Sequence, residues 1–194
     1  MSTSGNVSLG SVYPSLIGGM LNSFRYKNFD ISILFDGQWG GKFFSTSYMW
    51  GMYSGMLDET AGYNELGVLK RDSPDDDGGI LLKGVTEDGE VNTVRVDAET
   101  WGGSFYSGPA AQSVFSSDFI KLREITIGYT IPLKSNTIKN LKVSAYGRNL
   151  GLWGPDTKHF DPESATTNSG NVQGIEGGAL PSIATFGFNV GFQF

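Results

Sequence analysis

Large apolar side chains occupy every second position at the C-terminal end of the chain, from Thr185 to Phe194. Five apolar residues alternate there with small or polar ones: Phe186, Phe188, Val190, Phe192 and Phe194. Because a strand sends successive side chains to opposite faces, this segment has one continuous apolar face and one small or polar face. Its length matches a tilted membrane-spanning strand of about 9–11 residues. A soluble sandwich strand can alternate in the same way, but the unbroken apolar face fits the wall of a membrane barrel better.

The same alternation recurs in four earlier segments. Residues 18–26 and 29–38 alternate on either side of the polar step Lys27-Asn28, which predicts a β-hairpin. Residues 119–131 and 141–151 alternate as well, so about five long strands are expected, the last of them at 183–194. The alternation slips by one position at Arg123-Glu124, which indicates either a β-bulge or the membrane boundary.

Connections between the predicted strands are alternately short and long. Short turns are expected at 27–28 and 132–140, and long loops of poor periodicity at 39–118 and 152–182. Outer-membrane barrels combine short periplasmic turns with long extracellular loops. The predicted fold is therefore all-β: an antiparallel transmembrane β-barrel segment, or partial barrel, of about five long strands with two long extracellular loops. Within the first loop, the pattern is compatible with a short helix over 48–57 and a short strand over 91–96.

Composition excludes several other classes of protein. No apolar run approaches the ~18 residues of a membrane helix, and the absence of cysteine excludes disulfides and thiolate metal sites. A net charge of −6 without a basic patch argues against nucleic acid as a partner. The first residues, MSTSGNVSLG, lack the features of a secretory signal peptide. Since a closed barrel needs at least about eight strands, we expect the chain to be part of a longer exported protein or to borrow strands.

Catalytic and metal-binding arrangements are not predicted. The single histidine, His159, lies in a loop, and there is no cysteine with which a triad or zinc site could be completed. Residues 37–42 do not have the spacing of a phosphate-binding loop. The acidic run Asp75 to Asp77 could supply oxygens to calcium but lacks the EF-hand spacing, so a solvated loop is favoured. We therefore expect no enzymatic activity, no cofactor and no metal.

Aromatic residues of the two long loops are the candidate ligand contacts. Their faces can stack on sugar rings or on peptide side chains and bury a large area at little entropic cost. The alternatives are packing within the loops and the aromatic belts that barrels place at both membrane interfaces. The candidates for contact with a ligand or a lid are Trp39, Trp50, Tyr53, Trp101, Tyr106 and Trp153.

Several short motifs follow one another in a defined order. Residues 24–30 read FRYKNFD, residues 118–132 read DFIKLREITIGYTIP, and residues 146–150 read YGRNL. Asp161-Pro162-Glu163, Leu180-Pro181 and a terminal phenylalanine come after them. In this order the motifs resemble the C-terminal part of a SusC/RagA-type TonB-dependent receptor, the large barrel of Bacteroidetes nutrient importers. The match spans nearly the whole chain, is most specific at 118–132 and is loosest at 60–115.

The resemblance implies a barrel of about 22 strands, of which these would be the last five. It implies a location in the outer membrane, a SusD-like lipoprotein over the extracellular mouth, and coupling to the TonB complex through a plug that this chain does not contain. It also implies that the barrel-assembly machinery recognises the aromatic C-terminal strand, here through Phe186, Phe188, Phe192 and Phe194.

The sequence thus predicts the C-terminal barrel portion of a transporter for oligosaccharides or peptides. One alternative is a soluble, secreted β-sandwich that binds carbohydrate, which would turn its apolar strand faces into a core. Another is a barrel fragment without function, which differs only in whether the upstream sequence encodes a plug.

Overall fold

The computed structural model describes residues 7–86, 88–134, 137–165 and 173–194. The chain divides into two compact units. The sheet unit comprises Gly10–Phe43, Phe115–Gly174 and Ala179–Phe194, and the loop unit comprises Phe44–Val114, Ile175–Gly178 and the N-terminal residues as far as Leu9. Residues 135–136 of the second predicted turn and 166–172 of the second predicted loop lie outside the described residues.

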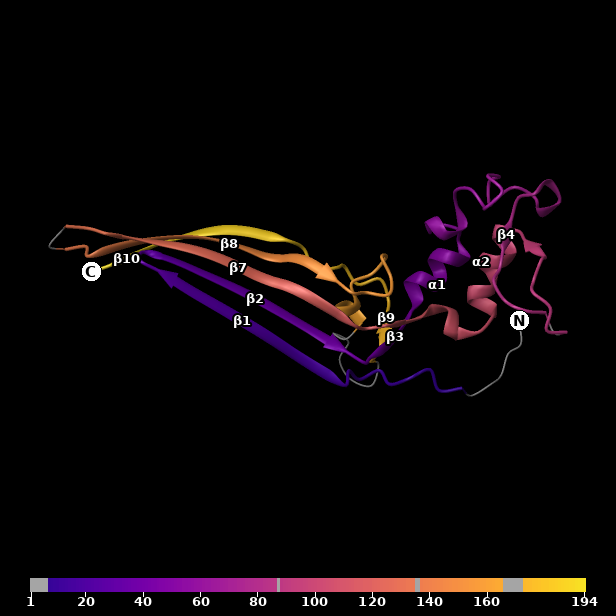
Figure 1. The fold of residues 1–194 in the computed structure, drawn as a ribbon, viewed down its shortest axis with the longest axis horizontal. Helices are drawn as coiled ribbons and strands as arrows, with labels where there is room; N and C mark the ends of the chain where they lie inside the picture. The colour runs from indigo at the N-terminus through magenta and orange to yellow at the C-terminus, as the bar shows by residue number, and fades with distance from the viewer. Residues whose placement is uncertain (1–6, 87, 135–136, 166–172) are drawn as a thin grey trace. The chain divides into compact units, whose positions relative to one another are not determined.

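A five-stranded antiparallel sheet with the order β1-β2-β7-β8-β10 forms the sheet unit (Figure 1). Its strands are β1 (Leu16–Tyr26), β2 (Phe29–Trp39), β7 (Phe119–Pro132), β8 (Asn140–Trp153) and β10 (Thr185–Gln193). These bounds differ from the predicted ones by two residues or fewer. The predicted all-β antiparallel fold is confirmed, with β1 and β10 as the outer strands of the sheet.

One face of this sheet is apolar across all five strands. A single row of paired residues shows this, because every member is apolar: Phe24, Ile31, Ile127, Ala145 and Phe188. The row is open to the surroundings, with Phe24 62%, Ile127 50% and Phe188 78% exposed. The alternation in the sequence therefore does produce one continuous apolar surface, and nothing among the described residues covers it.

A β-bulge at Arg123 keeps β7 in phase with its neighbours. Leu34 of β2 pairs with Glu124, whereas the next residue, Phe35, pairs with Leu122, so Arg123 is the extra residue. Because one inserted residue reverses the alternation, Leu122 and the isoleucines beyond the bulge share the apolar face. Of the two sequence interpretations of the slip, the β-bulge is confirmed.

The opposite face of the sheet is polar and carries ion pairs. Lys142 of β8 reaches across β7 to Asp30 of β2, with Nζ 2.9 Å from Oδ1. The residue of β7 opposite Asp30 is Gly128. A Cβ atom at Gly128 would lie 2.5 Å from Asp30 Oδ2, so a larger residue there would displace the Asp30 side chain from this position.

A buried ionic network holds the short 3-10 helix η4 (Pro162–Ala165) and Ser182 to the start of β7. Lys121 is 3% exposed, and its Nζ donates to Asp161 Oδ2 at 2.5 Å, to Glu163 Oε2 at 2.6 Å and to Ser182 Oγ at 3.2 Å. Burial raises the pKa of Asp161, but the hydrogen bonds from Lys121 and Ser182 outweigh it, and the pKa lies below its ordinary value. The hydrogen bonds from Arg123 likewise hold the pKa of Glu163 below its ordinary value, against the effect of burial. Both carboxylates are therefore ionised at neutral pH.

The loop unit is built on two helices, α1 (Thr46–Tyr53) and α2 (Ala98–Ser107). The first helix agrees with the pattern at 48–57, although it begins and ends earlier. The second helix was not predicted, because Gly102 and Gly103 weaken its propensity and its apolar residues are few. Between the helices, the strand expected at 91–96 is reduced to β5 (Arg95–Val96), which pairs with β4 (Ile80–Leu81). This part of the first long loop is therefore a folded unit rather than an irregular connection.

Short elements complete the chain. The strand β3 (Lys42–Ser45) pairs in parallel with β9 (Ile175–Glu176) through Phe44 and Ser45, and β6 (Val114–Ser116) precedes β7. The remaining single-turn 3-10 helices are η1 (Asp58–Thr60), η2 (Pro74–Asp76) and η3 (Ala110–Ser113). Throughout the described parts of the chain, every helix is too short or too polar to cross a membrane.

Candidate functional site

Helix α1 begins at a serine cap that is itself held by a buried glutamate. The Tyr48 N–H donates to Ser45 Oγ at 2.9 Å, and Ser45 Oγ donates to Glu176 Oε2 at 2.5 Å. Capping satisfies one of the helix's unpaired N–H groups, and Glu176, only 1% exposed, fixes the capping hydroxyl. Because Trp50 and Tyr53 are three residues apart on this helix, they lie on the same face.

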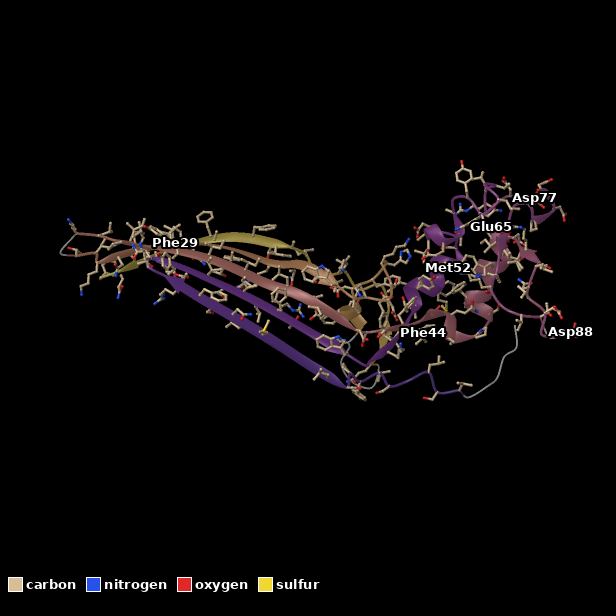
Figure 2. All side chains as sticks on the ribbon, in the orientation of Figure 1. Phe29, Phe44, Met52, Glu65, Asp77 and Asp88 are labelled. Atoms are coloured by element: carbon tan, nitrogen blue, oxygen red, sulfur yellow. The ribbon has the colours of Figure 1, made fainter. Side chains whose placement is uncertain are left out.

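Helix α2 begins at Asp97, whose carboxylate accepts the Thr100 N–H at 2.7 Å. This hydrogen bond holds the pKa of Asp97 below its ordinary value, so the side chain is ionised at neutral pH. The two helices approach closely where α2 carries Gly102, because a Cβ atom there would lie 2.5 Å from the Met52 carbonyl oxygen. Met52, labelled in Figure 2, is 0% exposed on α1, and Phe105 of α2 is 7% exposed. The close contact fixes the position of the surface side chains on either side of it.

Three aromatic side chains from these helices form one exposed cluster, which we call the aromatic triad: Trp50, Tyr53 and Tyr106. Ring centroids are 5.6 Å apart for Trp50 and Tyr53, 5.2 Å for Trp50 and Tyr106, and 5.5 Å for Tyr53 and Tyr106. These distances lie within the range of favourable aromatic pairs. The side chains are nevertheless 50%, 51% and 59% exposed. The triad is therefore a set of rings in mutual contact that still offers about half of its area to a partner.

A hollow of about 660 Å³ lies beside the triad and is bordered by Tyr53. Its charged lining residues are Arg71, Asp72, Asp97 and Glu99. A second hollow, of about 710 Å³, is lined by Tyr53, Asp97, Glu99, Thr100 and Gly103. Because Tyr53 and the two carboxylates border both, we treat them together as the Tyr53 hollow. Volumes of this order are typical of small-ligand sites.

The other three predicted contact residues do not join the triad. Trp101 lies on α2 and packs against Phe105, with ring centroids 5.7 Å apart, which is a packing role. Trp39 and Trp153 are the last residues of β2 and β8 and are 38% and 51% exposed. They stand at the loop ends of the sheet strands, where barrels carry interfacial aromatic residues. The six candidates are thus divided between the triad, a packing contact within α2 and the ends of the sheet.

The aromatic residues of the C-terminal strand extend from the apolar face of the sheet. Phe186, Phe188, Phe192 and Phe194 are 77%, 78%, 56% and 73% exposed. Their recognition by the barrel-assembly machinery stays a prediction.

The carboxylates of the Tyr53 hollow were missed by the sequence reasoning. Asp97 followed by Thr100 is a capping pattern, and Glu99 is an acidic residue in the first turn of a helix. These two features could have indicated the second helix, and with it an acidic border near the loop aromatics. Their distance from Tyr53 could not be predicted, because it depends on how α1 and α2 pack.

Curated proteins similar to this chain are TonB-dependent receptors. The chain is 29% identical over 203 residues to TonB-dependent receptor P26 of Formosa agariphila, and the alignment covers 99% of the chain and 18% of that protein. It is 21% identical over 202 residues to TonB-dependent receptor P3 of the same organism, and that alignment covers 100% of the chain and 18% of that protein. The chain thus spans less than a fifth of the length of these relatives. No family model matches the chain.

Solved structures of the RagAB peptide importer share the fold. The closed-closed state aligns with a TM-score of 0.61 at 17% identity, over 96% of this chain and 18% of the other. The open-open state aligns with a TM-score of 0.61 at 18% identity, over 100% of this chain and 19% of the other. These relatives are receptors and transporters rather than enzymes, in agreement with the non-enzymatic prediction. Along its whole length the chain is similar to TonB-dependent receptors, which confirms the resemblance to such receptors inferred from its motifs.

Proposed function

We propose that this chain is the C-terminal barrel portion of a TonB-dependent transporter in the outer membrane. The transporter would import oligosaccharides or peptides and work with a SusD-like lipoprotein. The observation that carries the proposal is the five-stranded sheet, which has an exposed apolar face on one side and a charged face on the other.

The two faces of the sheet support a position in a barrel wall. Monomeric soluble proteins rarely expose apolar patches larger than a few hundred Å², whereas here a whole sheet face is apolar and open. In lipid such a face is stable, because transmembrane strands alternate apolar residues toward the lipid with polar residues toward the interior. Ion pairs such as Lys142–Asp30 would then lie on the interior side. The sheet strands have 9 to 14 residues, enough to span a bilayer when tilted.

The soluble sandwich alternative is not supported by the sheet. A sandwich needs a second sheet packed over the apolar face to form its core. Among the described residues, the only other strand groups are the sheets β6-β3-β9 and β4-β5, whose strands are four residues or shorter. Phe188, at 78% exposed, is representative of the uncovered face.

Cysteine labelling tests the proposed membrane topology, since the chain has no cysteine of its own. Single substitutions Ser107→Cys in the loop unit, Lys134→Cys after β7 and Phe188→Cys on the apolar face would be placed in the complete reading frame in cells. A membrane-impermeant maleimide should label intact cells at Ser107→Cys only. Lys134→Cys should become reactive once the outer membrane is permeabilised, and Phe188→Cys only after denaturation. Labelling of Phe188→Cys in intact cells would contradict the barrel-wall proposal.

The aromatic triad is the part of the chain that we propose contacts the imported ligand. Uptake of labelled oligosaccharides and peptides by cells would be compared for Trp50→Ala, Tyr106→Ala and a control, Tyr63→Ala. Tyr63 is an aromatic residue of the same unit that is 70% exposed and lies outside the triad. Each triad variant should lower uptake several-fold while the control leaves it unchanged. Equal uptake by all variants would remove the triad from the ligand path.

A further inference from the structure

The loop unit carries a net negative charge, whereas the sheet unit does not. Between residues 44 and 114 the sequence contains twelve aspartates or glutamates and only four lysines or arginines. The whole chain has 20 acidic and 14 basic residues, so its net negative charge comes from this segment. A surface of one sign raises the local concentration of ligands of the opposite sign and repels those of the same sign.

The carboxylates that border the Tyr53 hollow have no cationic partner. Among the described residues, the ion pairs do not involve Asp72, Asp97 or Glu99. The one cation of the lining, Arg71, donates instead to two backbone carbonyls that also border the hollow. Its Nη2 donates to the Gly55 carbonyl at 2.5 Å, and its Nε donates to the Thr60 carbonyl at 3.1 Å. With three carboxylates and one guanidinium, the hollow has a net negative border beside an exposed aromatic surface.

We infer that the aromatic triad and the Tyr53 hollow bind a basic side chain, lysine or arginine, of a peptide ligand. This inference rests on the proposed role of the loop unit in ligand contact and narrows it to one class of substrate. An ammonium or guanidinium group is attracted both to an aromatic face and to carboxylates at its edge. The apolar stem of the same side chain can lie on the aromatic rings.

Charge complementarity favours this occupant over the other candidates. A neutral oligosaccharide can stack on the aromatic rings and donate hydroxyl hydrogen bonds to the carboxylates, but it brings no positive charge to offset the hydration that the carboxylates lose when a ligand covers them. An acidic oligosaccharide or acidic peptide would be repelled by the same groups. Among the described residues, no hydrogen bond involves the phenol hydroxyl of Tyr53 or Tyr106, so both hydroxyls remain available to the peptide backbone.

The test measures binding to the receptor expressed in its complete reading frame and purified in detergent. The probes are fluorescein-labelled Gly/Ser decapeptides that contain three lysines, three glutamines or three glutamates, and a neutral glucan hexaose. The charge variant is Asp97→Asn with Glu99→Gln, in which asparagine keeps the helix cap while both charges are removed. The control is Glu90→Gln, which repeats the Glu99→Gln half of the variant at an exposed glutamate outside the hollow. Trp50→Ala and Tyr106→Ala test the triad.

The lysine peptide should bind about tenfold more tightly than the glutamine peptide, and the preference should weaken with added salt. The double charge variant should lose most of this preference, and Glu90→Gln should retain it. Equal affinity for the lysine and glutamine peptides, no measurable binding of the lysine peptide, or an unchanged preference in the charge variant would overturn the inference.

The outcome also separates this inference from the proposed function. If the glucan or the glutamine peptide binds best and the triad variants weaken that binding, ligand contact by the triad stands and the basic-peptide inference is wrong. If the triad variants alter the binding of none of the probes, the role of the triad in ligand contact fails as well.

Discussion

Replacing Lys121 with methionine should release η4 (Pro162–Ala165) from the start of β7. Methionine keeps most of the apolar stem of lysine and removes the ammonium group. The variant therefore leaves Asp161, whose side chain is 6% exposed, with a buried charge and no cationic partner. Glu163 is 30% exposed and keeps its ion pair with Arg123, at 2.6 Å, so it is less affected.

The expected cost follows from the burial of this network. Removing one partner of a buried ion pair costs about 3–5 kcal/mol, mostly because the remaining charge stays desolvated. Since Glu163 retains Arg123, the lower end of this range, about 3 kcal/mol, is expected. A change of about 1.4 kcal/mol corresponds to a factor of ten. Local opening of the segment should thus become roughly 100-fold more frequent.

Hydrogen–deuterium exchange of the detergent-solubilised receptor measures this opening, in peptides that cover residues 156–165. Lys142→Met is the matched control, because it is the same substitution in an exposed ion pair, where Lys142 is 46% and Asp30 24% exposed. Exposed pairs contribute only about 0–1 kcal/mol, so the control should exchange almost as the wild type does.

The double variant Lys121→Met, Asp161→Asn separates lost charge compensation from lost packing. If the uncompensated carboxylate causes the opening, neutralising it should restore most of the protection. The reasoning would be refuted if Lys121→Met exchanged no faster than Lys142→Met, or if the double variant exchanged as fast as Lys121→Met alone.

Two further predictions concern the helices and the acid response. Gly102→Ala should cost about 1–3 kcal/mol, because its Cβ would lie 2.5 Å from the Met52 carbonyl oxygen, and it should weaken binding at the triad. Gly103→Ala, whose Cβ would meet nothing within 4 Å, should instead stabilise α2 by about 0.5–1 kcal/mol. Hydrogen–deuterium exchange of α1 and α2 measures the effect of both substitutions. Equal effects of the two would contradict the interpretation that the helices are in close contact at Gly102. Acid should loosen η4, because the pKa values of Asp161 and Glu163 are lowered in the folded protein. The stability that this lowering provides is complete above the ordinary pKa values of 3.8 and 4.5. It is lost as the pH falls through the folded-state pKa values. Pepsin cleavage within 156–165, normalised to an unstructured reference peptide, should therefore rise below about pH 4, and a flat profile between pH 5 and 2 would exclude this linkage.

The sheet was predictable because its determinants are local. Side-chain direction in a strand depends only on the parity of the position, so the alternation of residues such as Phe186 and Phe188 already defines a face. Even the bulge left a local trace, since the isoleucines on either side of Arg123 are out of phase in the sequence. The partner strand decided between a β-bulge and a membrane boundary at that slip, because Leu34 and Phe35 leave no residue opposite Arg123.

The loop unit shows the opposite case. Helix α2 contains two glycines and little periodicity, and its formation depends on a cap at Asp97 and on packing against α1 at Gly102. Six loop aromatics looked equivalent as candidates, but only Trp50, Tyr53 and Tyr106 come together. The spacing of Trp50 and Tyr53 on one helix is a sequence property, whereas the arrival of Tyr106 from α2 is not.

Four features follow from the amino-acid sequence alone: the strands, their apolar face, the order of short and long connections, and the similarity to TonB-dependent receptors. Each of these depends on periodicity or on motifs within a few consecutive residues. Tertiary packing, by contrast, makes part of the first long loop a folded unit, buries Lys121 between Asp161 and Glu163, and places carboxylates around the hollow beside the aromatic triad. These arrangements join residues about 40 or more positions apart, and the contacts that fix them form only when the chain has folded.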